Sequence, residues 1–274
     1  MELKKTNLKF TAYGETAGLT RVGKGYGART GTTRNGKEYK AIRFDFIINK
    51  EKRYKIQCDI FGSVRDEIYY RDNTSRKVIK DSWEKRFELA ENENNYVFPQ
   101  PYDAAVEIEM AEDGDYYRLR GDLRADQFEK DGKTFTSYKF SPEEASQPEF
   151  EHDYECTLSG DFVFDKVKGN KIYGYTVDYK KKTYPITFTW GGDKEILDDI
   201  KNAIQFGTLC NITNGKAEMV ESTSPSSRRS FGTSNDPSNL RIGFVLYGID
   251  IAREEPYTAK DLGIYDDEDE ELFK

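Results

Sequence analysis

YKAIRFDFIINKEKRYKIQCDIFG, residues 39–62, returns 130 residues later as GNKIYGYTVDYKKKTYPITFTWGG, residues 169–192. The two stretches align without gaps and share six of 24 residues. Each consists of an apolar run, a lysine-rich turn, a second run and a glycine, which predicts a β-hairpin. A pattern that recurs at a fixed offset indicates a duplicated domain. We therefore expect two copies of one β-rich unit.

The segments around each hairpin complete the unit. One more strand precedes each hairpin, and these strands share a threonine and a glycine; they are expected at residues 8–14 and 154–160. A helix is expected after the second hairpin at residues 193–206, where apolar residues recur every three or four positions. Its more charged counterpart is expected within residues 63–90. Two strands follow each helix, at residues 105–110 and 116–128 in the first unit and 209–220 and 240–251 in the second.

The order β-β-β-α-β-β is that of the OB-fold, a small barrel that often binds single strands or oligosaccharides. We expect a mainly β chain with two tandem OB-fold-like five-stranded barrels, each with one helix, and a disordered acidic C-terminal tail. The first domain is expected at residues 1–145, the second at 146–258 and the tail at 259–274. Residues 141–152, SPEEASQPEFEH, have the composition of a linker, and residues 222–239 that of a long loop.

Charge is distributed unevenly along the chain. The net charge is -8, but residues 1–65 hold fifteen Lys or Arg against six Asp or Glu. The last fourteen residues, 261–274, hold seven carboxylates and one lysine, so the rest of the chain is nearly balanced. This pattern favours a partly basic body that attracts polyanions and an acidic, solvated tail that lies outside the core.

Several classes of protein are disfavoured by composition. The three cysteines are far apart and the single histidine, His152, lies in the linker-like segment, so we expect no disulfide, no metal site, no cofactor and no enzyme. The chain has no apolar signal core and no stretch long enough for a membrane span, which favours a cytoplasmic protein.

The glycine-rich loop at residues 15–38 is the first candidate ligand-binding segment. It contains six glycines and joins the first two predicted strands, where OB-folds commonly grip ligands. Its guanidinium and ammonium groups can bind phosphate, and its tyrosine can stack on a base. The candidate residues are Arg21, Lys24, Tyr26, Arg29, Arg34 and Lys37. A mobile, solvated loop is the alternative.

The first hairpin supplies further cations. Alternation places Ile42, Phe44, Phe46 and Ile48 toward the core and Arg43, Asp45 and Ile47 outward. The second strand alternates in the same way. Its open face, together with that of the first strand, would present Arg43, Arg53 and Lys55. Such cations also serve as ordinary protection of a sheet edge.

The same register carried to the second hairpin turns Tyr173, Tyr175 and Tyr179 outward beside Lys180 and Lys182. Exposed aromatics next to cations suit sequence-tolerant stacking of bases. A slip of one residue would instead bury the three tyrosines. Arg228 and Arg229 add a small basic cluster in the second long loop.

Basic OB-like units followed by an acidic tip with a terminal aromatic resemble phage and bacterial single-stranded DNA-binding proteins. The resemblance covers roughly the whole chain, and its most specific part is the tip. In that family the tip docks on replication and repair proteins and can compete with DNA. The matching residues are Asp266, Asp267, Glu268, Asp269, Glu270, Glu271, Leu272 and Phe273. Two departures are Lys274 after the aromatic and the presence of two units in one chain.

The resemblance implies a protein that coats single-stranded DNA during replication or recombination, without sequence preference, and recruits partners through its tail. The residues leave two alternatives open. The same surfaces suit an RNA-binding or transcription-regulating factor, and the barrels also suit a protein-interaction module whose tail only maintains solubility.

Overall fold

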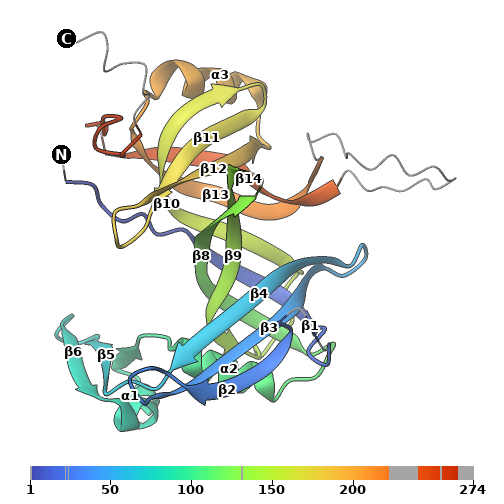
Figure 1. Ribbon diagram of the computed structural model, residues 1–274, viewed down its shortest axis with the longest axis vertical. Coiled ribbons are helices and arrows are strands. Elements are labelled where there is room, and N and C mark those ends of the chain that lie inside the picture. The colour runs from blue at the N-terminus through green and yellow to red at the C-terminus, as the bar shows by residue number, and fades with distance from the viewer. Residues whose placement is uncertain are drawn as a thin grey trace, which may run out of the picture.

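The chain folds mainly into β-strands, which confirms the predicted class (Figure 1). The computed structural model describes residues 2–21, 23, 25–130, 132–221, 240–253 and 255–264. In the first half the strands are β1 (Lys9–Ala17), β2 (Gly27–Thr32), β3 (Glu38–Asn49), β4 (Tyr54–Ser63), β5 (Glu67–Asp72), β6 (Val78–Ser82), β7 (Asn95–Val97), β8 (Tyr116–Lys130) and β9 (Lys133–Ser146). In the second half they are β10 (Glu155–Lys168), β11 (Lys171–Val177), β12 (Thr183–Trp190), β13 (Leu209–Glu221) and β14 (Leu240–Arg253). A 3-10 turn (Trp83–Lys85) precedes α1 (Arg86–Glu91), and the other helices are α2 (Pro101–Glu109) and α3 (Lys194–Ala203).

The first half closes into a ring of five strands, called ring 1. β1 pairs with β3, β3 with β4, β4 with β9, β9 with β8, and β8 with β1. The β4–β9 pair is parallel, at Cys58 and Phe140, and the other four are antiparallel. β2 extends the ring by pairing with β3. Helix α2 packs against β3, β4 and β9, and its Ala104 and Ile108 join the core of this ring.

The second half closes into an equivalent ring, called ring 2. Here β10 pairs with β11, β11 with β12, β12 with β14, β14 with β13, and β13 with β10. The parallel pair β12–β14 includes Phe188 and Phe244. In the gapless repeat Phe188 corresponds to Cys58, which makes the parallel pair in ring 1. Both predicted hairpins are therefore confirmed, and they occupy corresponding places in the two rings.

The rings meet where their first strands pair with each other. β1 and β10 run antiparallel, with Thr11 directly opposite Thr157. These are the shared threonines of the two predicted first strands, so the junction has the arrangement of a local two-fold axis. The glycines that the two first strands share leave no room for a side chain. A Cβ at Gly14 would lie 1.9 Å from the carbonyl oxygen of Ile47, and a Cβ at Gly160 would lie 1.7 Å from that of Asn7.

The long β8–β9 hairpin reaches from the first half of the molecule into the second (Figure 1). The hydroxyl groups of Tyr138 in β9 and Thr176 in β11 are 2.8 Å apart. The rings of Phe140 and Phe244 meet edge to face at 6.3 Å. Buried residues of both rings consequently form one continuous hydrophobic cluster.

Two elements of the first half differ from the prediction. Residues 105–109 belong to helix α2 and not to a strand, and Met110 follows its end, because Pro101 starts the helix and Ala104, Ala105 and Ile108 form its buried side. The counterpart helix expected at residues 63–90 is mostly replaced by the small sheet β6-β5-β7, with the short helix α1 beside it.

The expected linker and the expected loop also contain strands. Residues 141–146 complete β9, where Ser141 and Phe140 are buried, so the connection between the halves begins after Ser146. The loop at 15–38 contains β2, which forms a hairpin with β3. The helix expected at 193–206 is confirmed as α3, with Leu197 and Ile200 buried and Ile196 exposed.

The segment at residues 255–264 packs onto ring 2. Tyr257 and Leu262 are 1% and 2% exposed and lie in a second cluster with Leu3 and Val177. Asp261 accepts hydrogen bonds from the Thr258 amide and hydroxyl, at 2.8 and 2.7 Å, which closes the turn. Residues 261–264 are therefore part of the fold, so the tail expected from residue 259 or 261 begins later. Within the described part of the chain, no helix has the length and apolar character needed to cross a bilayer.

Candidate nucleic-acid interface

A polar cluster built around Asp45 lies on the outer face of β3 and β4. The hydroxyl of Tyr26 donates to Asp45 Oδ1 at 2.7 Å and accepts from Gln57 Nε2 at 2.7 Å. Arg21 lies over the Tyr26 ring at 4.5 Å and reaches Asp45 at 3.3 Å, and Lys55 ion-pairs with the same carboxylate. Two cations thus surround one carboxylate, and the cluster keeps a net positive charge.

This cluster explains why Asp45 is only 4% exposed although alternation points it outward. The segment before β2 folds back over the sheet, and Tyr26 and Arg21 cover the carboxylate. Ile47, also expected outward, is buried because β1 pairs with β3 at Glu15 and Ile47. Ile42, Phe44, Phe46 and Ile48 face the core as predicted; all four are buried.

On the same face, beyond Arg43 and Asp59, lies an aromatic pair of the half-buried Tyr39 and the exposed Phe61. Their ring centroids are 5.2 Å apart, and Phe61 is 54% exposed. Arg29 of β2 lies opposite Ala41, which lies opposite Phe61, so the guanidinium and the aromatic pair share one face of the sheet. Arg29 is exposed and ion-pairs with no described residue. We call this surface the ring 1 face: Arg21, Tyr26, Arg29, Tyr39, Arg43, Lys55 and Phe61.

Phe61 was not among the predicted site residues, although the sequence carried its signal. The outward positions of the second strand include residues 55, 57 and 59, and position 61 continues that alternation. Tyr39 gives a weaker signal because it stands at the start of β3.

The other predicted cations of the first half are placed differently. Arg43 belongs to the ring 1 face but is partly neutralised by Asp59, with Nε 3.1 Å from Oδ2. Arg34 is exposed in the β2–β3 turn, and Lys37 pairs with Asp66. Arg53 lies at the far end of the β3–β4 hairpin, where it pairs with Glu15 at 3.3 Å.

The corresponding face of ring 2 is more covered. Tyr173 and Tyr175 are half-buried, and Tyr175 packs against the cluster that contains Leu3, Tyr257 and Leu262. Of the three tyrosines predicted to face outward, Tyr179 is the exposed one, with 73% of its surface accessible. For Tyr175 the cause is the chain itself, because the N-terminal and 255–264 segments pack onto the end of β11.

The lysines of the β11–β12 turn lie beside aromatic rings. Lys180 Nζ is 5.5 Å from the Tyr179 ring centroid, and Lys182 Nζ is 5.2 Å from that of Tyr184. Lys24, Arg228, Arg229 and the tail residues 266–273 lie outside the described residues.

The titratable groups of the described residues offer little for catalysis. No group of three or more His, Cys, Asp or Glu side chains is placed to hold a metal ion in the ranges that the structure describes. The thiols of Cys58, Cys156 and Cys210 are buried, and burial raises the pKa of Cys210 to about 12. These thiols stay protonated near neutral pH and are poor nucleophiles.

Comparison with known proteins gave distant structural likenesses. No protein-family model and no curated protein sequence matches the chain. Among the solved structures that resemble it are two of a single-stranded DNA-binding protein. One is the wild-type protein from Thermus aquaticus, 11% identical over 94% of this chain and 98% of that chain, with a TM-score of 0.42. The other is a deletion mutant of the same protein, 10% identical over 92% and 98% of the two chains, with a TM-score of 0.41. Likenesses this distant do not show what this chain binds.

Proposed function

We propose that this chain is a non-catalytic protein that binds single-stranded DNA without sequence preference. The observation that carries the proposal is the ring 1 face, where the exposed Phe61, paired with the half-buried Tyr39, lies beside Arg29 on the same face as the Asp45 cluster. Aromatic faces stack on any base, and guanidinium groups bind phosphate without reading sequence. The face has both components.

We propose further that each ring is an OB-fold barrel. The five-strand cycle, the parallel pair between its third and fifth strands and the helix between its third and fourth strands support this assignment. OB-folds bind oligonucleotides on the face of their second and third strands, which are β3 and β4 in ring 1. The expected domains at 1–145 and 146–258 fit the rings once the boundary moves to Ser146 and residues 259–264 join the second domain.

Titration of fluorescent oligonucleotides over a range of salt concentrations tests the proposal. We expect affinity for oligo-dT to fall steeply with salt, because bound phosphates release counterions, and to differ little among base compositions. A preference for duplex DNA would refute the proposal. Tighter binding of RNA than of DNA of the same sequence would instead assign an RNA-binding role, and absence of any oligonucleotide binding would favour a protein-interaction module.

For the tail we propose recruitment of replication or recombination proteins in the cytoplasm of a bacterial or phage-infected cell. The acidic run followed by Leu272 and Phe273 suits a basic pocket with an apolar floor. Deleting residues 265–274 should abolish capture of such partners and modestly tighten DNA binding at low salt. An unchanged DNA affinity at low salt would remove the idea that tail and DNA compete.

A further inference from the structure

One cationic side chain, Arg124 of β8, lines two cavities that belong to different parts of the molecule. The first, of about 520 Å³, lies at the end of β4 and is lined by Phe61, Arg65, Tyr69, Phe98 and Arg124 among others. The second, of about 400 Å³, lies between the N-terminal segment, β8 and the β11–β12 turn, and its lining includes Lys5, Arg124, Tyr179 and Tyr184. Arg124 is therefore the point at which the two cavities adjoin.

Each cavity carries an exposed aromatic side chain at its wall. Phe61, from the ring 1 face, is 54% exposed, and Tyr179, from the β11–β12 turn of ring 2, is 73% exposed. The β8–β9 hairpin, which carries Arg124, passes from the first half of the molecule to the second (Figure 1). Since Arg124 lines both cavities, a strand that follows them from one aromatic to the other meets its side chain.

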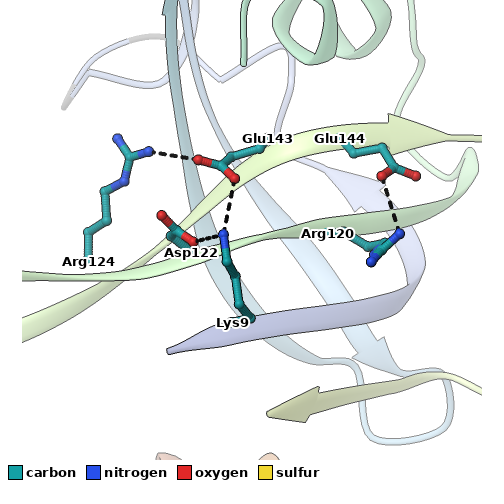
Figure 2. A network of polar contacts seen from close by, with 6 residues as sticks. All are labelled: Lys9, Arg120, Asp122, Arg124, Glu143 and Glu144. Atoms are coloured by element: carbon teal, nitrogen blue, oxygen red, sulfur yellow. Dashed lines mark hydrogen bonds and ion pairs between the residues drawn. The ribbon is translucent and has the colours of Figure 1, made fainter. Parts of the chain in front are cut away.

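The ion pairs around Arg124 leave it available to a phosphate. Its Nη2 is 3.2 Å from Glu143 Oε1, and the side chain is 50% exposed. Glu143 also pairs with Lys9 at 3.3 Å, as Figure 2 shows, so it keeps a cationic partner when Arg124 turns to another anion.

The carboxylates that line the second cavity, Asp122 and Asp178, also have partners within the protein. Asp122 pairs with Lys9. Asp178 accepts hydrogen bonds from the amides of Lys180 and Lys182 at 2.7 and 2.9 Å and from the Tyr184 hydroxyl at 3.0 Å. In contrast, Lys5 and Arg65 are exposed cations that ion-pair with no described residue. Cations thus remain unpaired on both sides of Arg124.

We propose that a single DNA strand passes from ring 1 to ring 2 at Arg124. The guanidinium binds a phosphate of the segment that connects the nucleotides stacked on Phe61 with those stacked on Tyr179. This inference rests on the proposed function and adds the path of the strand. Its consequence is that Arg124 matters only for an oligonucleotide long enough to occupy both rings, because binding to the second ring is then intramolecular.

The experiment compares Arg124→Gln with Arg120→Gln on a short and a long oligonucleotide. Arg120 is a matched control: it is 48% exposed on the same strand and pairs with a neighbouring glutamate, Glu144, at 3.5 Å, yet lines neither cavity (Figure 2). Since one OB barrel holds roughly 4 to 16 nucleotides, oligo-dT of about 6 and about 30 nucleotides separates one-ring from two-ring binding.

We expect Arg124→Gln to weaken binding of the long oligonucleotide about 10-fold and to lower its salt slope by about 1, while binding of the short one changes less than about 2-fold. Arg120→Gln should leave both affinities within about 2-fold of the wild type. Thermal melts of both variants check that neither has lost its fold.

Four outcomes would overturn the inference. If Arg124→Gln lost the same affinity for the short and the long oligonucleotide, Arg124 would belong to the binding site of one ring. If Arg120→Gln lost as much affinity for the long oligonucleotide as Arg124→Gln does, the effect would come from the overall charge of the protein. Unchanged binding of the long oligonucleotide by Arg124→Gln would remove the crossing point while leaving the proposed function intact. A wild-type protein that binds neither length would refute the proposed function, and the strand path with it.

Discussion

Replacing Phe61 by alanine tests the proposed DNA contact most directly. The ring is 54% exposed and contacts Tyr39 at 5.2 Å, so the change removes a stacking surface more than a core side chain. Truncating a fully buried Phe costs about 3 to 5 kcal/mol, and for a ring about half exposed we expect a loss of roughly 1 to 2 kcal/mol of folding stability. Stacking of one base is worth about 1 to 3 kcal/mol, which corresponds to a 5- to 150-fold loss of affinity.

The assay is fluorescence anisotropy with labelled oligo-dT, combined with denaturant unfolding of each variant. Phe150→Ala is the control, because Phe150 is 75% exposed in the connection between the halves. Phe61→Trp should retain affinity, since an indole also stacks. The assignment of Phe61 as a stacking residue fails if Phe61→Ala binds as tightly as the wild type, or if Phe150→Ala loses as much.

Three further predictions concern stability. Truncation after Lys260 should cost about 2 to 3 kcal/mol because it removes buried Leu262, whereas truncation after Ile264 keeps Leu262; equal denaturation midpoints for the two would contradict the placement of this segment. Gly14→Ala should cost at least about 2 kcal/mol of folding stability, because the new Cβ meets the Ile47 carbonyl oxygen. Gly36→Ala, where a Cβ would have nothing within 4 Å, should cost about 1 kcal/mol. Comparable losses of stability for the two variants in chemical denaturation would argue against the close contact at Gly14. Burial, reinforced by Glu107, raises the pKa of Tyr117 to about 12 from 10.0. Its contribution to folding stability is therefore intact below pH 10 and is lost as the pH rises toward 12, by about 1.4 kcal/mol per pH unit. Tyr117→Phe should flatten the dependence of folding stability on pH between about 10 and about 12, and an unchanged alkaline profile in this variant would refute the prediction.

The sequence predicted the elements whose local pattern agrees with their tertiary role. Both hairpins of the repeat and helix α3 follow from alternation and from an apolar stripe. Helix α2 was mistaken for a strand because AVEIEM, residues 105–110, alternates like one, while the signal that matters, Pro101 at the helix start, lies outside that window. The end of β9 was read as linker because Pro142 and two glutamates are unusual in a strand, yet the strand is bulged at this point.

The candidate site was harder to predict than the fold. Arg43, Arg53 and Lys55 were expected on one face of the hairpin, and Arg21 and Tyr26 in the loop before it. Arg21, Tyr26 and Lys55 meet at Asp45, whereas Arg53 lies at the far end of the hairpin. Local alternation could not show that Tyr26 folds back over Asp45, nor that residues distant in sequence, Leu3 and Tyr257, cover Tyr175. These are consequences of chain segments folding back on the sheet, which depend on contacts that a periodicity does not encode.

The pairing of β1 with β10 gives the two rings a permanent one-to-one stoichiometry. The same strand pairing between separate chains would dissociate on dilution, but inside one chain it is independent of protein concentration. Each ring is also encoded separately, so a substitution in one is not copied into the other, as it would be in a homodimer. The two rings differ accordingly: Phe61 is exposed on ring 1, whereas Tyr257 and Leu262 pack against ring 2 and cover part of it.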